Sequence, residues 1–308
     1  MAERLSDIVT QIQNVRQLEA VVTAMRGIAA SRAQKGRSLL AGIESYTDVV
    51  SRAIGHALKL QSAETTFAPP HRQPKLGLIL FCAEQGFAGA FSDRVLDAAG
   101  SDLERAVNLI VGTRGAVIAG ERGVKSTWSA PMPTDVDAVI GFANLLADTL
   151  YNYIAASTIE KVDILFSRSL SGSGIVIDRH SLLPIDFSRF AQPIDNEAPL
   201  ITLPPEILLE RFAAEYVFAQ LCQAAMHSFE AENEARMLAM ASAKTNIDSE
   251  LIGLSQQERR LRQEQITSEI VELAAGAEAL LGGGSERRCC ARVGARRRPP
   301  HGTSGDFV

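Results

Sequence analysis

Small and apolar residues recur near the N-terminus at steps that average 3.5 residues. They are Ile8, Ile12, Val15, Leu18, Val22, Met25 and Ala29. This spacing is the coiled-coil repeat rather than the 3.6 of a straight surface helix. No proline precedes Pro69, and the segment TTFAPPHRQP (65–74) then ends the pattern. The sequence therefore predicts an N-terminal coiled-coil helix within residues 1–64.

A second helical pattern runs through residues 206–281 and carries two apolar stripes. The first stripe is Phe212, Tyr216, Ala219, Cys222, Met226 and Phe229, and the second is Ile266, Ile270, Leu273, Ala277 and Leu280. At 1.5 Å per residue, ~75 helical residues would span roughly 110 Å, and ~55 at the N-terminus roughly 80 Å. Neither length fits inside a compact domain, so we expect two long terminal helices that pair antiparallel and cover each other's stripes.

Between these helices, residues 75–205 change to short runs rich in Leu, Ile and Val. Strands are predicted at 75–82, 106–112, 162–168 and 174–179, and amphipathic helices at 91–105 and 137–157. Residues 184–205 hold five prolines and are expected to form an extended connector. Strands that alternate with helices favour a partly parallel sheet. The expected fold is thus a small Rossmann-like α/β domain inserted between the helices of a long antiparallel coiled coil. Residues 282–308 lack any apolar period and are predicted to be a disordered basic tail.

Charge and composition restrict the possible partners. The chain has 308 residues, 46% hydrophobic and 22% charged, which is ordinary for a soluble globular protein. Its net charge is −5, but the tail holds six Arg against Glu286 and Asp306, so residues 1–281 carry −9. A negative body with only 6% aromatic residues argues against nucleic-acid binding. No signal peptide is expected, and the longest apolar run is far shorter than the ~20 residues of a membrane span. Membrane contact is therefore expected only through partners.

Motifs for catalysis, cofactors and metals are missing from the sequence. There is no GK dipeptide for a phosphate-binding P-loop and no GxSxG elbow, and the third glycine position of GSGIVI is Ile177. Neither the five His nor the four Cys show metal-ligand spacing or a disulfide framework. The turns AEQGFAG (83–89) and GTRG (112–115) each follow a strand, and a plain tight turn is the preferred interpretation of the first. We therefore predict no catalytic residue, metal or cofactor, and a mechanical or binding role.

Three parts of the chain resemble one family. They are IQNVRQLEAVVTAMRGIAASR (12–32), AEQGFAGAFSDRVL (83–96), and the C-terminal blocks AENEARMLAMASAKTNIDSELI (231–252) and RQEQITSEIVELAAGAEAL (262–280). In this order they resemble the gamma subunit, or central stalk, of the F-type rotary ATP synthases, over about residues 3–281. The first two stretches are also similar to an alternate, sodium-type bacterial branch of these synthases.

The resemblance implies a non-catalytic axle. Such a subunit turns inside a hexameric ring of alpha and beta subunits, which hold the active sites, and its base is attached to the epsilon subunit and to a membrane ring of c subunits. It couples ion flow to ATP synthesis or hydrolysis. The expected location is peripheral, on the cytoplasmic face of the bacterial inner membrane.

The resemblance also implies positions that couple the axle to the ring. These are Met25, Glu232, Arg236, Arg262, Gln263 and Thr267. Glu232 and Arg236 are four residues apart, can form an ion pair, and are expected to face outward to the ring. The alanine-rich face of residues 235–246 is expected to press on the N-terminal helix where Gly27, Ala29, Ala30 and Ser31 allow close approach.

Two other functions remain open at this stage. The chain could be a nucleotide-binding α/β module with coiled-coil arms, which binding of a nucleotide by the isolated chain would support. It could also be a free-standing coiled-coil scaffold, which would self-associate without ATPase subunits. Neither explains the three family-like stretches.

Overall fold

The computed structural model of the chain describes residues 2–60, 74–170, 174–190 and 200–289. The chain divides into two compact units. The larger unit is Glu19–Asn246, and the smaller combines Met1–Leu18 with Ile247–Val308. Both terminal helices contribute to both units.

The two long terminal helices are present as predicted. Helix α1 covers Ala2–Leu60 and helix α5 covers Pro205–Cys289. Helix α5 continues past Leu281 into the segment that was predicted to be disordered, and residues 290–308 of that segment lie outside the described residues. Among the described residues, no helix combines the length and the apolar character that a membrane span requires.

The α/β part of the larger unit contains a five-stranded mixed sheet. Its strands are β1 (Leu76–Phe81), β2 (Val107–Val111), β3 (Trp128–Ala130), β4 (Lys161–Leu170) and β5 (Gly174–Leu183). They lie in the order β3-β2-β1-β4-β5, and all neighbours are parallel except β4 and β5. The four predicted strands and the partly parallel pairing are confirmed. The short strand β3 was not predicted.

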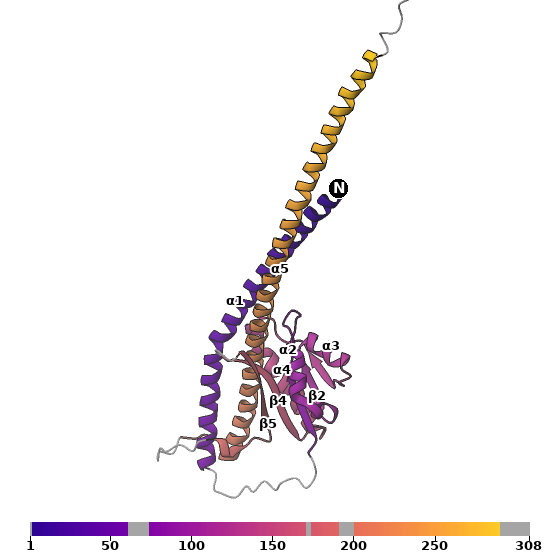
Figure 1. Cartoon of the computed structure of the whole chain (residues 1–308). Helices are drawn as coiled ribbons and strands as arrows, with labels where there is room; N and C mark the ends of the chain where they lie inside the picture. The colour runs from indigo at the N-terminus through magenta and orange to yellow at the C-terminus, as the bar shows by residue number, and fades with distance from the viewer. Residues whose placement is uncertain (1, 61–73, 171–173, 191–199, 290–308) are drawn as a thin grey trace, which may run out of the picture. The chain divides into compact units, whose positions relative to one another are not determined.

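Helices cover both faces of this sheet (Figure 1). Helices α2 (Phe91–Ala99) and α3 (Thr113–Glu121) pack on the face formed by Leu78, Leu80 and Ile110. Helix α4 (Val139–Ala155) and helix α5 pack on the face formed by Ile79, Phe81 and Leu109. Because the central strand β1 is buried on both faces, its sequence LGLILF is a continuous apolar run rather than an alternating one. Among the described residues there are also three short 3-10 helices: η1 (Gly100–Glu104), η2 (Val136–Ala138) and η3 (Phe187–Arg189).

Within the larger unit, α1 and α5 lie antiparallel. Lys244 Nζ lies 2.8 Å from Glu19 Oε1, and Arg37 Nη2 lies 2.7 Å from Glu230 Oε1. Further along α1, the Tyr46 hydroxyl donates to Glu215. As the residue numbers on α1 increase from 19 to 46, those of the contacting residues on α5 decrease from 244 to 215. This is the antiparallel pairing that the sequence predicted.

The position of closest approach differs from the prediction. A Cβ added to Gly36 would lie 3.2 Å from Phe229 Cδ1 and 3.4 Å from Glu230 Cβ, whereas one added to Gly27 would meet no atom within 4 Å. Ala29 is buried, but Gly27 and Ser31 are exposed. The alanine face of α5 is also shared, because Ala231 and Ala235 pack on the α/β domain rather than on α1. Gly36, not Gly27, therefore lets the two helices approach each other.

Candidate functional site

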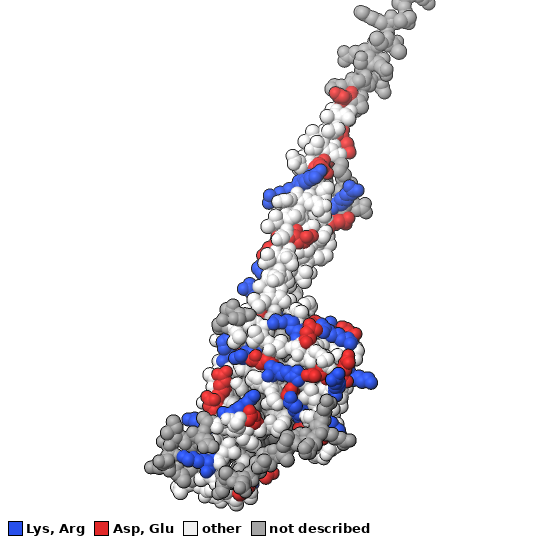
Figure 2. Space-filling view, turned by 60° about the horizontal axis from the view of Figure 1, so that its bottom comes forward, with Lys and Arg blue, Asp and Glu red and all other residues white. Residues whose placement is uncertain are grey.

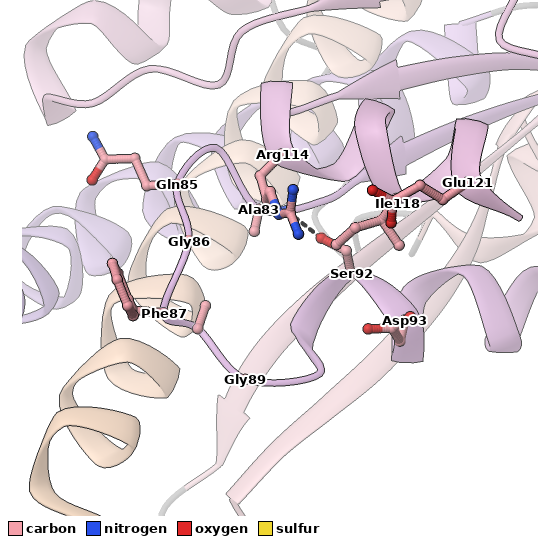
Figure 3. Close-up of a pocket in the computed structure, with 11 residues that line it drawn as sticks. Ala83, Gln85, Gly86, Phe87, Gly89, Ser92, Asp93, Arg114, Ile118 and Glu121 are labelled. Carbon is pink, nitrogen blue, oxygen red and sulfur yellow. Dashed lines mark hydrogen bonds between the residues drawn. The ribbon is translucent and has the colours of Figure 1, made fainter. Parts of the chain in front are cut away.

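The turn Ala83–Gly89 follows β1 and lies beside α5. Phe87 and Gly89 have left-handed backbones, with φ of 63° and 62°. The N–H of Ala83 donates to Ser92 Oγ at 3.1 Å, which ties the turn to the start of α2. Figure 3 shows the turn at the edge of a pocket of about 470 Å³, with Arg114, Ile118 and Glu121 of α3 on one side and Ser92 and Asp93 of α2 on the other. The turn therefore connects the end of the central strand to three helices.

Glu232 of α5 holds the backbone of this turn. Its two carboxylate oxygens accept from the N–H groups of Glu84 and Gln85, each at 3.1 Å. Hydrogen bonds from backbone amides to an ionised carboxylate are stronger than those between neutral groups. Glu232 is only 4% exposed, so water competes little for these bonds.

Arg236 holds the carbonyl groups of the same turn, one helical turn further along α5. Its guanidinium donates to Gly86 O at 3.2 Å and to Gln85 O at 3.3 Å. It also donates to Asn233 Oδ1 at 3.1 Å and forms an ion pair with Glu232. Arg236 is 5% exposed. We refer to Glu232, Arg236 and the turn 83–89 together as the latch.

The latch corrects one expectation and confirms another. The predicted i,i+4 ion pair between Glu232 and Arg236 is present. The prediction that these charges face outward is wrong, because both side chains are buried within the chain. Every residue from 224 to 233 is buried, since this part of α5 packs in the interior of the larger unit. Because the ion pair is buried, water cannot readily replace either of its charged partners.

Glu84 continues the network from the turn into α3. Its carboxylate accepts from Thr113 N at 2.9 Å, Thr113 Oγ1 at 2.8 Å and Met132 N at 2.8 Å. Thr113 is the first residue of α3, where backbone N–H groups lack helical partners. The carboxylate of Glu84 therefore stabilises the start of α3 while its own N–H is held by Glu232.

Two glycines of GTRG allow α3 to begin so close to β1. A Cβ added to Gly115 would lie 2.0 Å from Cys82 Cβ, and Gly112 has a φ of 107°. Burial raises the pKa of the Cys82 thiol to about 12, so the group beneath the turn is a neutral packing residue. GTRG is thus a packing motif.

The backbone N–H groups of Glu84, Gln85 and Thr113 are not available to a phosphate. In nucleotide-binding α/β proteins, free N–H groups after a strand and at a helix N-terminus receive the phosphates. Here the carboxylate of Glu232 occupies the N–H groups of Glu84 and Gln85, and that of Glu84 occupies the N–H of Thr113. Carboxylates of the chain itself therefore take the place of an anionic ligand. Within the described ranges, no cluster of three or more His, Cys, Asp or Glu side chains could hold a metal ion.

A second polar group joins α1, α5 and the sheet. Arg37 of α1 donates to Glu230 of α5 from Nε at 2.9 Å and from Nη2 at 2.7 Å. Arg37 also lies 3.4 Å from Glu234, whose carboxylate accepts from Ser169 of β4. Burial raises the pKa of Glu230, and the charge and hydrogen bonds of Arg37 oppose that rise. We call Arg37, Glu230, Glu234 and Ser169 the helix bridge.

The other predicted coupling residues are not members of the latch. Met25 is half-buried on α1 in the larger unit. Arg262, Gln263 and Thr267 are exposed on α5 in the smaller unit. Arg262 pairs with Glu258 at 2.7 Å, and Thr267 Oγ1 donates to Gln263 O at 2.9 Å, both within the same helix. These three side chains thus form a solvated helix face that a partner could reach.

Sequence reasoning missed Glu84, Arg37, Glu230 and Phe87. Glu84 and Phe87 lie inside a turn whose glycines drew attention to its backbone rather than its side chains. Arg37 and Glu230 are ordinary charges on two helices, and their pairing depends on the register of the coiled coil. The sequence did contain one signal for a buried latch. Ala231 and Ala235 are small, and they leave room for another backbone to pack beside Glu232.

The surface carries charges of both signs. Figure 2 shows Lys and Arg interspersed with Asp and Glu on the visible face of the α/β domain. Arg122, for example, forms ion pairs with Asp93 and Asp97. A mixed surface of this kind lacks the basic stripe that is typical of nucleic-acid binding.

Comparison of the sequence with known proteins agrees with the family-like stretches. A family model described as ATP synthase matches residues 4–280. The gamma chain of Bdellovibrio bacteriovorus is 26% identical over 293 residues, which cover 90% of this chain and 99% of that protein. A gamma chain of Acetobacterium woodii that is named as sodium ion specific is 28% identical over 305 residues, covering 91% and 100%. The gamma chain of a Parafrankia species is 27% identical over 310 residues, covering 92% and 100%.

Solved structures share the fold. A chain of the mitochondrial ATP synthase of Euglena gracilis, from a structure of OSCP, F1 and the c-ring, has a TM-score of 0.61 at 11% identity, with 98% of this chain and 100% of that chain covered. A chain of the rotor of the same synthase has a TM-score of 0.56 at 10% identity, covering 86% and 100%. The family model spans nearly all of the chain, from the first turns of α1 to the exposed end of α5, and the chain belongs to the ATP synthase gamma-chain family.

Proposed function

We propose that this chain is the rotating central stalk of an ATP synthase and transmits torque between a membrane rotor and catalytic subunits that surround it. Its partners are the alpha and beta subunits of the ring, the epsilon subunit and the c subunits. The active sites belong to the ring, and the chain itself is not catalytic. In a bacterial cell the complex lies at the cytoplasmic face of the inner membrane, and the chain contacts that membrane only through its partners.

Torque transmission requires the helices and the α/β domain of the larger unit to turn together. The latch fixes the turn after β1 to α5 through four hydrogen bonds between side chains and backbone. The helix bridge fixes α1 to α5 and α5 to β4. The buried pair of Glu232 and Arg236 tolerates little slippage, because displacing one partner leaves the other charge without compensation. In the helix bridge Glu230 is buried, whereas the Arg37 side chain is 55% exposed. These two networks support a stalk that resists twisting.

The exposed apolar residues near the end of α5 support a contact with the ring subunits inside which the chain would rotate. All residues from 271 to 278 are exposed, including Val271 and Leu273, and Leu273 is 75% exposed. Exposed apolar side chains grouped on one segment mark a surface that partners cover. A hydrophobic sleeve formed by the ring subunits would bury this segment while leaving it free to rotate.

The exposure and backbone conformation of Phe87 support a further contact between the chain and the ring. It is 67% exposed and has a left-handed backbone, which is rare for a bulky residue. The latch holds the backbone that leads into Phe87, because Gln85 and Gly86 are bonded to Glu232 and Arg236. Strained residues that are held in place in this way are common at functional sites. Phe87 is thus positioned to meet an apolar surface of a ring subunit.

The single observation that carries the proposal is the match of the family model over residues 4–280. Arg262, Gln263 and Thr267 are the positions at which this stalk would contact a catalytic subunit in each turn. They are exposed, and the bonds of Arg262 and Thr267 lie within α5, so a role in folding is small.

The double variant Arg262→Ala/Gln263→Ala is expected to reduce ATP turnover or ATP-driven ion pumping in the assembled complex by about fivefold. A change of ~1 kcal/mol in the relative energies of rotational states alters their populations by that factor. Its melting temperature should stay almost unchanged, since surface changes usually shift stability by about 0.5 kcal/mol or less. Both properties are measured on the same preparation.

Glu250→Ala is the matched control for this experiment. Glu250 is exposed on the same helix, and its position twelve residues before Arg262 places it about 120° away around the helix axis. It should leave turnover unchanged. Normal turnover and pumping in the double variant would refute the coupling role, and a collapse of the chain's stability would show that the two residues are structural instead.

A further inference from the structure

A second cavity lies between α1, α4 and α5, away from the latch. Its volume is about 540 Å³, and its walls come from four elements of the larger unit: α1, η2, α4 and α5. The lining includes Leu39 and Ile43 of α1, Val139 and Ile140 at the start of α4, and Cys222 and Met226 of α5. Leu39 and Ile140 are exposed, so the cavity is open to the surface. Pockets for small organic molecules in proteins usually measure ~300–1,000 Å³ and have apolar walls. This cavity meets both criteria.

Gly42 lines the cavity at an exposed position of α1. A Cβ added at this position would meet no atom within 4 Å. Glycine in a helix interior weakens the helix, and any ordinary residue here would strengthen α1. A larger side chain at position 42 therefore has room to extend over the lining of the cavity.

The charges around the cavity select against anions. Its lining contains no Lys or Arg and one carboxylate, Asp137, which is exposed at the edge. The Tyr46 hydroxyl donates to Glu215 and remains protonated, because burial and that carboxylate raise the pKa of the phenol. Asp137 and Glu215 would both repel a negative ligand.

The side chains of the lining favour aromatic ligands. Cys222 and Met226 present sulfur atoms, which make favourable contacts with aromatic rings, and Phe218 and Tyr46 offer rings for stacking. Burial raises the pKa of the Cys222 thiol to about 11, so this group is a neutral contact rather than a nucleophile. Binding here is therefore non-covalent.

We propose that the cavity between α1, α4 and α5 binds an uncharged aromatic small molecule. Such a ligand would contact all three helices at once and would stabilise the packing of the α/β domain on the helix pair. This inference does not depend on the proposed role as a stalk. It assigns a ligand site to a part of the chain that the latch and the coupling residues do not use.

Nile red, an uncharged aromatic dye that fluoresces in apolar surroundings, is the probe for this site. The full-length chain is expected to bind one molecule with saturable fluorescence. Gly42→Leu should weaken binding at least tenfold, because its side chain fills the cavity, and should not lower the melting temperature. Gly120→Leu on α3 is the control, since an added Cβ there also meets no atom within 4 Å, and it should bind the dye like the unmodified chain.

Two results would overturn the assignment. One is equal Nile red affinity in Gly42→Leu and the unmodified chain, or no saturable binding, which would place any dye elsewhere on the surface. The other is release of bound dye when the ring and membrane subunits are added. That release would show that the cavity is part of a subunit interface rather than a ligand site.

Discussion

Replacing Glu232 by alanine is expected to lower the free energy of unfolding of the larger unit by about 3–5 kcal/mol. The substitution leaves the buried guanidinium of Arg236 without its ion-pair partner. It also leaves the N–H groups of Glu84 and Gln85 without their acceptor. Removing one member of a buried charged pair costs more than removing the whole pair, because the remaining charge stays out of water.

Two variants make this result specific. Glu232→Gln keeps an acceptor of nearly the same shape but loses the charge, and should cost less, about 1–3 kcal/mol. Glu210→Ala removes an exposed carboxylate from the same helix and should change stability by about 0.5 kcal/mol or less. Denaturant unfolding gives the free energies, and hydrogen exchange at the amides of Glu84 and Gln85 reports on the latch directly. Unchanged exchange of these amides in Glu232→Ala would show that the latch does not form.

The second large effect is expected at Gly115. In Gly115→Ala the new Cβ would lie 2.0 Å from Cys82 Cβ and 3.1 Å from its Sγ, with both atoms in a buried cluster. Helix α3 must then move away from β1, and overpacking of this kind typically costs about 1–3 kcal/mol. The shift would also pull Thr113 away from Glu84, which connects α3 to the latch.

Gly120→Ala separates crowding from helix propensity. Gly120 lies on the same helix with no atom within 4 Å of an added Cβ, so alanine there should raise stability by about 0.5–1 kcal/mol. Melting temperatures of the two variants should therefore move in opposite directions. If Gly115→Ala is as stable as the unmodified chain, the close contact between α3 and β1 is wrong.

The architecture could be predicted because it depends on long, periodic patterns. Repeats of 3.5 residues over many turns specify α1 and α5, and continuous apolar runs specify strands that are buried on both faces. Strand β3 has only three residues, Trp128–Ala130, and helix α3 carries two glycines within nine residues. Elements this short take their conformation from the sheet beside them, so their own sequence gives little signal.

The latch could not be predicted because its contacts join residues about 150 positions apart. Spacing along α5 correctly indicated that Glu232 and Arg236 pair, but it could not indicate what lies beside them. Charges four residues apart usually occupy a solvated face, and here the turn after β1 buries them instead. Arg262, Gln263 and Thr267, which follow the same kind of pattern, are exposed as a solvated face should be.

Rotation of the chain inside the ring can be measured directly in single complexes. A cysteine in place of exposed Lys125 would carry a light-scattering particle, with Cys289 and Cys290 replaced by serine; Cys82 and Cys222 are buried and would not react. With the alpha–beta ring fixed to a surface, a rotating stalk predicts stepwise turning of the particle in one direction while ATP is hydrolysed, and arrest when ATP is withdrawn. Steady ATP hydrolysis by complexes whose particle does not turn would contradict the assignment of the chain as a rotating stalk.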